Sequence, residues 1–142
     1  DRSELGGRSE FKALDILDDD LGGPFDLVLL SENVHNFGPD QNIQLLKNIA
    51  RHLSPGGRVA IKDARIAADR SGPQAALRFA FALSLFSEHG TVYSEADVAE
   101  FLKAAGLEHE ESLTLETRPN SYLVIGHDKA DTSVLNDGDY RS

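Results

Sequence analysis

The chain has 142 residues, enough for one domain with a single hydrophobic core. Its formal net charge of −10 disfavours nucleic acid and anionic membranes as partners, because both select for clustered Lys and Arg. It has no cysteine, which excludes disulfides, thiolate catalysis and cysteine metal sites. We therefore expect a soluble, cytoplasmic protein that binds a small neutral or cationic molecule and no metal. The lack of any methionine predicts a processed or partial chain.

The N-terminal part of the chain predicts two strands separated by a loop. Residues 10–13 are expected to form a short strand. Residues 18–20 are three adjacent aspartates, and because adjacent side chains diverge, a solvated turn explains them better than a metal site. Residues 26–30 form an almost continuous apolar run, which is typical of a central strand in a parallel sheet covered on both faces.

A helix and a further strand follow. Apolar residues recur at helical spacing over residues 41–53, and Asp40 is the expected N-cap. The Pro-Gly-Gly sequence at 55–57 should end this helix before a strand over residues 58–62. Because this glycine pair follows a helix and precedes a strand, it does not predict a phosphate-binding loop. Two strands joined by a helix-length connection predict a right-handed unit of a parallel sheet.

Two more helices are expected in the second half of the chain. Residues 73–88 predict a helix whose apolar residues cover nearly its whole circumference, so we expect it to be buried on several sides. Ser94 and Asp97 form a variant capping box that opens the next helix. This helix should run to Ala105 and end at Gly106.

The C-terminal part predicts a pair of antiparallel strands at one edge of the sheet. The strands are expected over residues 108–115 and 121–126, with a turn at residues 118–120 between them. Residues 127–142 are polar, acidic and unpatterned, which predicts a disordered tail. The folded domain is therefore expected to span residues 1–126.

Two motifs carry most of the information about function. Residues 25–37 read F-D-L-V-L-L-S-E-N-V-H-N-F, and residues 53–61 read L-S-P-G-G-R-V-A-I. They resemble class I S-adenosylmethionine-dependent methyltransferases, most closely the small-molecule O-methyltransferase branch, with the resemblance extending over residues 11–126. It implies an α/β fold with a Rossmann-like methyltransferase sheet of parallel strands plus a C-terminal antiparallel pair. It also implies S-adenosyl-L-methionine as cofactor and methyl transfer to a hydroxyl oxygen of a small aromatic acceptor.

The resemblance assigns three residues to the cofactor. Asp15 lies in A-L-D-I, where the family has G-D-[FIL], so Leu14 replaces the usual glycine. By resemblance, the Asp15 carboxylate accepts a hydrogen bond from the adenine amino group and Ile16 covers the ring. Ser31 follows the central strand and is expected to contact the methionine part of the cofactor. An ordinary aspartate at the end of a strand is the structural alternative for Asp15.

The resemblance also assigns a catalytic base. His35 matches the histidine of L-H-D-W in plant phenolic O-methyltransferases, which removes the proton from the acceptor hydroxyl. Histidine suits this role because its ordinary pKa is about 6.5, which leaves neutral imidazole available near pH 7. Asp63 stands where those enzymes have a glutamate that orients the histidine, and its shorter side chain requires a closer backbone. The second orienting glutamate falls near Val92, which cannot replace it, so His35 is either a weaker base or a group that positions the acceptor.

Two residues are expected to contact the methyl acceptor. Asn36 stands where the family often has an acidic residue. Phe79 lies on the apolar helix predicted over residues 73–88, which in the family covers the acceptor cavity. Aromatic walls suit a planar phenolic acceptor, although simple core packing explains each phenylalanine equally well.

The family's glycine-rich turn is missing from the sequence, and so is the acidic residue that ends the second strand. By resemblance the chain starts just before the third strand of a seven-stranded sheet ordered 3-2-1-4-5-7-6. The strand over residues 26–30 would then lack a neighbour and expose an apolar edge that favours pairing with another chain. We expect a homo-oligomer, or pairing with a missing N-terminal half.

Two other functions remain open at the level of sequence. Methyl transfer to nitrogen needs positioning more than a base, and it fits the incomplete set of orienting residues. A methyltransferase-like interaction module without catalysis fits the missing glycine-rich turn.

Overall fold

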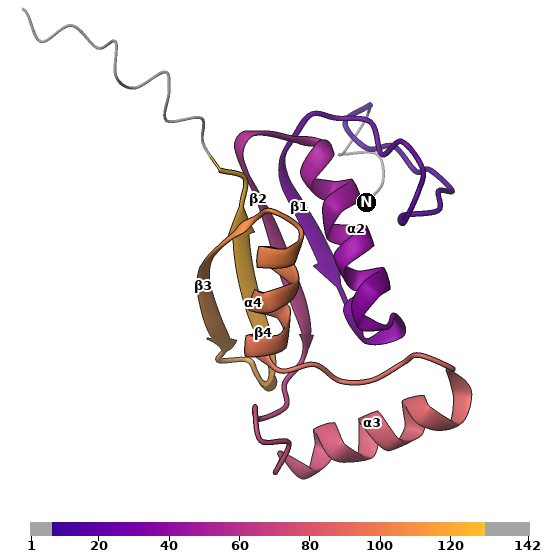
Figure 1. Ribbon diagram of the computed structural model, residues 1–142, viewed down its shortest axis with the longest axis vertical. Coiled ribbons are helices and arrows are strands. Elements are labelled where there is room, and N and C mark those ends of the chain that lie inside the picture. Colours follow the sequence, from indigo (N-terminus) through magenta and orange to yellow (C-terminus); the bar gives the residue numbers. More distant parts are fainter. Residues whose placement is uncertain (1–6, 130–142) are drawn as a thin grey trace, which may run out of the picture.

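A four-stranded mixed sheet forms the centre of the structure (Figure 1). The computed structural model describes residues 7–129 of the chain. The strand order is β1-β2-β4-β3, with β1 parallel to β2 and the other neighbours antiparallel. The strands are β1 (Phe25–Ser31), β2 (Leu53–Ala64), β3 (Glu108–Leu115) and β4 (Arg118–His127). The expected α/β sheet, a parallel pair extended by an antiparallel C-terminal pair, is confirmed.

The helices lie on one face of the sheet and beyond one end of it. They are the 3-10 helix η1 (Val34–Asn36) and the α-helices α2 (Pro39–Arg51), α3 (Gln74–Phe86) and α4 (Glu95–Ala104). Figure 1 shows α2 and α4 against the same face, and α3 beyond the ends at which β1 and β2 finish. Within residues 7–129, no helix is long and apolar enough to cross a membrane.

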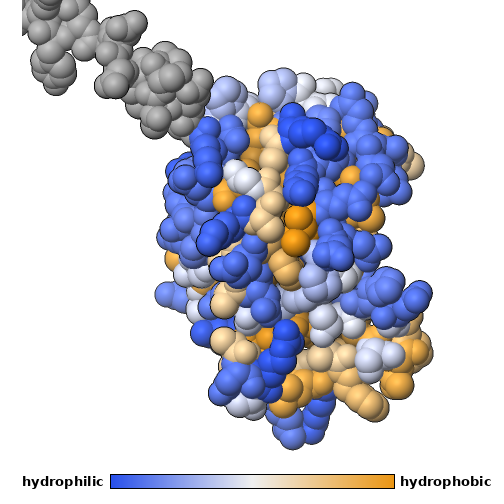
Figure 2. All heavy atoms as spheres, in the orientation of Figure 1, coloured by the Kyte–Doolittle hydropathy of each residue, from blue (hydrophilic) through white to orange (hydrophobic). Residues whose placement is uncertain are grey.

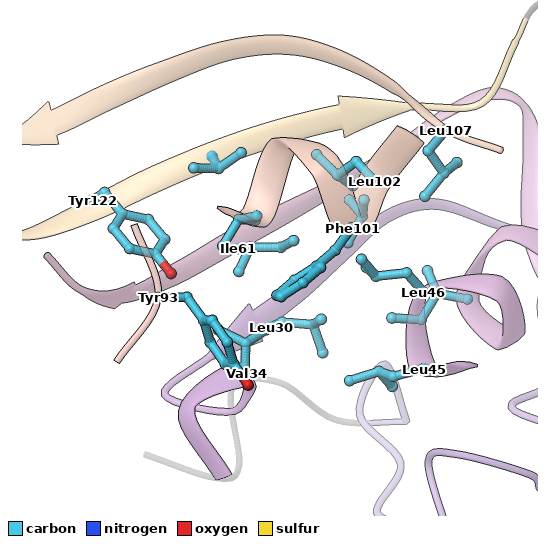
Figure 3. Packing of buried hydrophobic residues seen from close by; sticks show 14 of the residues in the cluster. Leu30, Val34, Leu45, Leu46, Ile61, Tyr93, Phe101, Leu102, Leu107 and Tyr122 are labelled. Atoms are coloured by element: carbon cyan, nitrogen blue, oxygen red, sulfur yellow. The ribbon is translucent and has the colours of Figure 1, made fainter. Parts of the chain in front are cut away.

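The main hydrophobic core fills the space between the sheet and the helices α2 and α4 (Figure 3). It includes Leu30, Val34, Leu45, Leu46, Ile49, Val59, Ile61, Val98, Phe101, Leu102, Tyr122 and Val124. Each fully buried side chain of this size contributes about 1.5–3 kcal/mol. The strand β4 approaches α4 closely at Gly126, where a Cβ atom would lie 2.7 Å from Cδ2 of Leu102. The absence of a side chain at Gly126 thus lets α4 pack directly against β4.

The register of the parallel pair brings two strand ends together. Leu30 lies opposite Ile61, and Ser31 lies opposite Lys62. The polar residues that follow β1 are therefore next to the last residues of β2. Because ligands of open α/β sheets bind at the carboxyl ends of the strands, a site is expected at this edge.

The two long helices on the sheet begin in different ways. Ser94 caps α4 as predicted: its hydroxyl accepts from the N–H of Asp97 at 3.1 Å, and its own N–H donates to the Asp97 carboxylate at 2.8 Å. The predicted N-cap Asp40 of α2 is wrong, because Gly38 holds that position and Pro39 is the first helical residue. Proline favours this position since its fixed φ suits a helix start and its missing N–H would have had no partner there.

The short strand predicted at residues 10–13 is wrong. These residues are exposed and form no strand. Phe11 is 89% exposed. A strand needs a neighbour that satisfies its backbone groups, and no described strand lies beside this segment.

Two turns also differ from expectation. The hairpin between β3 and β4 turns at Glu116 and Thr117, so the predicted turn at residues 118–120 is wrong and those residues belong to β4. The Pro-Gly-Gly sequence at 55–57 lies within β2, where the pairing with β1 shifts register between Phe25 and Leu27. The strand β4 continues to His127, and residues 130–142 of the expected tail lie outside the described residues.

The helix α3 is much less buried than its composition predicts. Its buried residue is Ala76, and the expectation that the helix is covered on several sides is wrong for the described residues. Phe81, Leu85 and Phe86 are 67%, 62% and 89% exposed. Figure 2 shows apolar side chains gathered over this helix. The residues 7–129 provide only one packing face for a helix that is apolar all round.

The strand β1 forms an open edge of the sheet. Its residues Leu27 and Leu29 are 61% and 62% exposed. The neighbouring residues Val28 and Leu30 instead pack toward the core, as the alternation along a strand requires. The predicted unpaired apolar edge is therefore present in this part of the chain.

Candidate active site

The candidate site lies at the carboxyl end of the parallel strands. His35 is carried by η1, which begins three residues after β1, and Asp63 is the last residue but one of β2. Although 28 positions separate them in the sequence, the parallel register brings them into contact. Both residues are buried, with 8% of His35 and 1% of Asp63 exposed.

His35 and Asp63 are joined by two hydrogen bonds. Nδ1 of His35 lies 2.7 Å from Oδ1 of Asp63, and the backbone N–H of His35 donates to Oδ2 at 3.3 Å. The N–H of Ala64 donates to Oδ1 at 2.7 Å. The carboxylate of Asp63 thus accepts two backbone N–H groups in addition to its contact with the imidazole. Because a carboxylate oxygen accepts hydrogen bonds, a neutral His35 that bonds to Asp63 carries its proton on Nδ1 and leaves Nε2 as an acceptor.

The environment favours the protonated form of His35. The hydrogen bond that the His35 imidazole donates to Asp63 raises the pKa of this imidazole above its ordinary value, and the charges of Asp63 and Glu32 act in the same direction. Burial opposes this rise because it disfavours the charged imidazolium. A raised pKa makes the neutral imidazole a stronger proton acceptor, while the fraction of neutral His35 near pH 7 falls.

Glu32 adds a second carboxylate to the site. One ligand-type atom from each of Glu32, His35 and Asp63 lies within 4.8 Å of the others. Three such residues are a common metal-binding set, but here Glu32 forms an ion pair with Lys62. The ammonium group of Lys62 supplies the positive charge that balances Glu32. Glu32 also has a φ of 57°, in the left-handed region, which turns the chain from β1 toward η1.

Phe79 contacts the ring of His35, whereas the side chain of Asn36 bonds to Glu32. The ring of Phe79 meets the imidazole edge to face, with centroids 5.0 Å apart and planes at 73°. This contact attaches α3 to the site, and it places an aromatic wall beside the imidazole. Asn36 is exposed, and its side-chain N–H donates to the Glu32 carbonyl at 3.3 Å.

The residues assigned to the cofactor do not form one continuous site. Ile16 lines an apolar pocket of about 270 Å³ beside β1. The other lining residues are Leu21, Val28, Leu29, Leu30, Asn33, Leu45 and Ile49. Asp15 is exposed in a turn, where its Oδ1 accepts from the N–H of Leu17 at 3.0 Å. Ser31 is exposed at the end of β1, and its carbonyl accepts from the Asn33 side chain at 3.2 Å.

These residues fit one end of S-adenosylmethionine. An apolar pocket with a half-buried isoleucine on its wall suits the flat adenine ring, and the exposed Asp15 carboxylate suits the amino group of adenine. Residues 7–129 contain no glycine-rich turn between a strand and a helix, which is a common way to hold a polar cofactor group. The fit is therefore limited to the adenine end.

Three residues at the site have no role assigned to them from the sequence motifs. Glu32 belongs to the motif over residues 25–37, but its place beside Asp63 follows only when the ends of β1 and β2 lie side by side. Asn42 and Tyr93 contact the turn that carries His35, although they lie on α2 and before α4. The spacing of Glu32 three residues before His35 is the single feature of the sequence that points to any of them. Val92 is fully buried in a small cluster with Ile66 and Ala76 and has no polar role.

Comparison with known proteins identifies the family. The O-methyltransferase domain family matches residues 3–108, most of the chain. A similar characterised protein is 3-hydroxy-5-methyl-1-naphthoate 3-O-methyltransferase from Streptomyces sahachiroi, which is 32% identical over 122 residues. That alignment covers 86% of this chain and 35% of the relative.

Solved structures have the same fold. An O-methyltransferase family protein from Burkholderia thailandensis superposes with a TM-score of 0.78 at 25% identity, over 92% of this chain and 39% of that one. Human N-acetylserotonin methyltransferase, solved with S-adenosylmethionine, superposes with a TM-score of 0.74 at 20% identity, over 85% and 34% of the two chains. The chain thus spans about a third of the length of these proteins. The sheet with its carboxyl-edge histidine and the match over residues 3–108 show that this chain belongs to the O-methyltransferase family.

Proposed function

We propose that these residues form the acceptor side of the active site of an S-adenosylmethionine-dependent O-methyltransferase. The observation that carries this proposal is the buried pair of His35 and Asp63 at the carboxyl edge of the parallel strands. A histidine with its Nδ1 proton fixed by a carboxylate is a suitable base for a hydroxyl group. The proposed acceptor is a small aromatic alcohol, because a similar relative is described as acting on a hydroxynaphthoate and Phe79 supplies an aromatic wall.

In this proposal the residues of the chain orient the acceptor and remove its proton. S-adenosylmethionine, when bound, supplies an electrophilic methyl group, so positioning and deprotonation are the main tasks left to the protein. Nε2 of His35 accepts the hydroxyl proton, and Asp63 stabilises the imidazolium that forms. Phe79 and Asn36 are the proposed contacts to the acceptor. Ile16 and Asp15 are the proposed contacts to adenine. Ser31 is the proposed contact to the methionine part of the cofactor.

Replacing His35 by alanine tests the role of the base in the full-length protein. Turnover of a phenolic acceptor should fall about a hundredfold, because general base catalysis typically contributes that much or more. Affinity for S-adenosylhomocysteine, measured by calorimetry, should stay nearly unchanged since His35 lies outside the apolar pocket. Unchanged turnover in this variant would show that His35 is not the base. A flat rate profile from pH 6 to 8 would instead favour transfer to nitrogen.

The open edge of β1 favours a second candidate, an interaction module that pairs with another chain. Exposed Leu27 and Leu29 lie on a strand with a free row of backbone groups, which is a common site of strand addition. The proposed partner is either a second copy or an N-terminal methyltransferase half. Calorimetry with S-adenosylhomocysteine separates this candidate from the enzyme. Micromolar binding by the full-length protein would support catalysis, and no binding at millimolar ligand would support the module.

A further inference from the structure

The turn that carries His35 is held from outside by two buried side chains. Asn42, on α2, donates from Nδ2 to the carbonyl of Val34 at 3.0 Å and to that of Phe37 at 3.2 Å. The hydroxyl of Tyr93 donates to the same Phe37 carbonyl at 2.7 Å. Asn42 is fully buried and Tyr93 nearly so. The two side chains thus hold the carbonyls on either side of His35.

The turn has little stability of its own. It comprises three residues, and the Asn33 side chain before it makes no capping hydrogen bond. Its internal bonds run from Asn36 N–H to the Asn33 carbonyl at 3.0 Å and from Phe37 N–H to the Val34 carbonyl at 3.3 Å. A single 3-10 turn gains few hydrogen bonds for the backbone freedom that it loses. Its position must therefore come from contacts with larger elements.

Asn42 and Tyr93 both connect the turn to the main core. Asn42 belongs to a helix whose residues Leu45, Leu46 and Ile49 are fully buried. The ring of Tyr93 packs edge to face on Phe101 of α4, with centroids 5.0 Å apart. Figure 3 shows Tyr93 beside Val34, at the end of the core nearest to η1. Through these two residues, the packing of the core fixes where the backbone of His35 lies.

The carbonyl of His35 itself is held as well. The N–H of Thr91, two residues before Tyr93, donates to the His35 carbonyl at 3.0 Å. The carbonyls of Val34 and His35 in η1, and that of Phe37 directly after it, therefore all accept bonds from other elements. This leaves the imidazole facing Asp63, where a distance of 2.7 Å requires the backbone to be placed accurately.

We infer that Asn42 and Tyr93 are positioning residues that hold the backbone of η1 so that His35 meets Asp63. The inference rests on the proposed role of His35 as base, but the geometry that it explains is independent of that role. A buried amide is costly unless its hydrogen bonds are satisfied, and the Oδ1 atom of Asn42 has no hydrogen bond with the described residues. A leucine would fill the same space without that cost. The donated bonds to the two carbonyls give the asparagine a function at this position.

The test uses Asn42→Leu, which keeps the volume and removes both donors, and Tyr93→Phe, which removes the third. Asn48→Leu is the matched control. Asn48 is equally buried on the same helix and also donates to two carbonyls, those of Ile16 and Asp19, both at 3.0 Å. Neither of these two bonds reaches the turn that carries His35. All variants are made in the full-length protein.

The first measurement is the titration of the His35 imidazole by NMR. Both Asn42→Leu and Tyr93→Phe should move its pKa down toward 6.5, because a displaced imidazole loses part of its bond to Asp63. Asn48→Leu should leave this titration unchanged. The second measurement is turnover of a phenolic acceptor, which should fall about tenfold in Asn42→Leu while affinity for S-adenosylhomocysteine is unchanged.

The outcomes separate this inference from the proposed function. A lower His35 pKa in both variants supports the positioning role. If the unmodified protein also shows no methyl transfer, the proposed enzymatic function is wrong while the positioning role stands. Normal turnover and an unchanged titration in a folded Asn42→Leu protein overturn the positioning role. An equal fall in pKa in Asn48→Leu also overturns it, since the effect would then reflect general loosening of α2.

Discussion

The imidazole of His35 and the carboxylate of Asp63 face one another at 2.7 Å, and the same carboxylate also accepts the His35 backbone N–H. The ring and the backbone of one residue are thus fixed by a single partner on a neighbouring strand. This arrangement determines which nitrogen carries the proton and which direction the other nitrogen faces. The predictions about activity follow from this relationship.

Removing the charge of Asp63 should weaken His35 as the proposed base while leaving binding of S-adenosylhomocysteine nearly unchanged. In Asp63→Asn, the amide can no longer stabilise an imidazolium, and the preferred protonation of the His35 ring is no longer fixed. We expect turnover of a phenolic acceptor to fall about a hundredfold with little change in affinity for S-adenosylhomocysteine. Steady-state kinetics and calorimetry measure the two quantities. A proportional loss of both would show instead that Asp63 supports the fold of the cofactor side.

Activity and stability should change in opposite directions with pH. The pKa of His35 is raised mainly by its hydrogen bond to Asp63. The native state therefore holds a proton more tightly than the unfolded state does, whose histidine titrates near 6.5. The stability gained from this proton is fully present below pH 6.5 and is lost as pH rises through the raised value. The neutral base gains population over the same window, so kcat/KM should rise while the free energy of unfolding falls.

Asp63→Asn is the control for this pH dependence. With its charge removed, the pKa of His35 should return toward 6.5, and the stability change in that window should largely disappear. Denaturant unfolding between about pH 5.5 and about pH 8.5, a span that brackets histidine titration, measures the change. If the unmodified protein and Asp63→Asn show the same profile, another group is responsible for it.

Tyr122 should tolerate loss of its hydroxyl group. It lies opposite Asp63 in the β2 and β4 pairing, and its hydroxyl is buried without a hydrogen-bond partner among the described residues. Burial raises the pKa of Tyr122 well above its ordinary value, so the hydroxyl stays neutral. We expect Tyr122→Phe to leave the free energy of unfolding unchanged or to raise it by about 1 kcal/mol.

Tyr93→Phe provides the comparison for Tyr122→Phe. The Tyr93 hydroxyl donates to the Phe37 carbonyl at 2.7 Å, so its removal should cost about 1 kcal/mol of stability. Both variants keep the aromatic ring and differ in whether a hydrogen bond is lost. Chemical denaturation of the two proteins under identical conditions measures the difference. A larger loss in Tyr122→Phe than in Tyr93→Phe would contradict the prediction.

The open edge of β1 should cause association of the 142-residue chain. Replacing both Leu27 and Leu29 by lysine places charge on the free edge and should shift the chain toward monomer in sedimentation velocity. Leu113→Lys is the control, because Leu113 is a partly exposed leucine on the opposite edge strand β3. A chain that is already a uniform monomer at every concentration would show that this edge does not drive association.

Local sequence patterns determined much of the fold. The apolar run over residues 26–30 defined β1, and the Ser94 and Asp97 capping pair defined the start of α4, because these features act within a few residues of one another. The failures have a different origin. Residues 10–13 have a composition compatible with a strand, but strand formation requires a neighbour, and α3 is apolar all round, but burial requires elements on several sides. Neither condition can be read from the segment itself.

The sequence by itself determined the family, the strand that precedes the site and the presence of His35 at its carboxyl end, since each depends on residues close together in the chain. Only the tertiary structure decided that Asp63 reaches His35, that Glu32 joins them with Lys62 as its ion-pair partner, and that Asn42 and Tyr93 hold the turn. Those contacts depend on the parallel register of β1 and β2 and on helices packed over the same core. The geometry of these contacts is set by residues far apart in the sequence. The types of His35 and Asp63 show that they can form a hydrogen bond, but only the fold brings them to 2.7 Å.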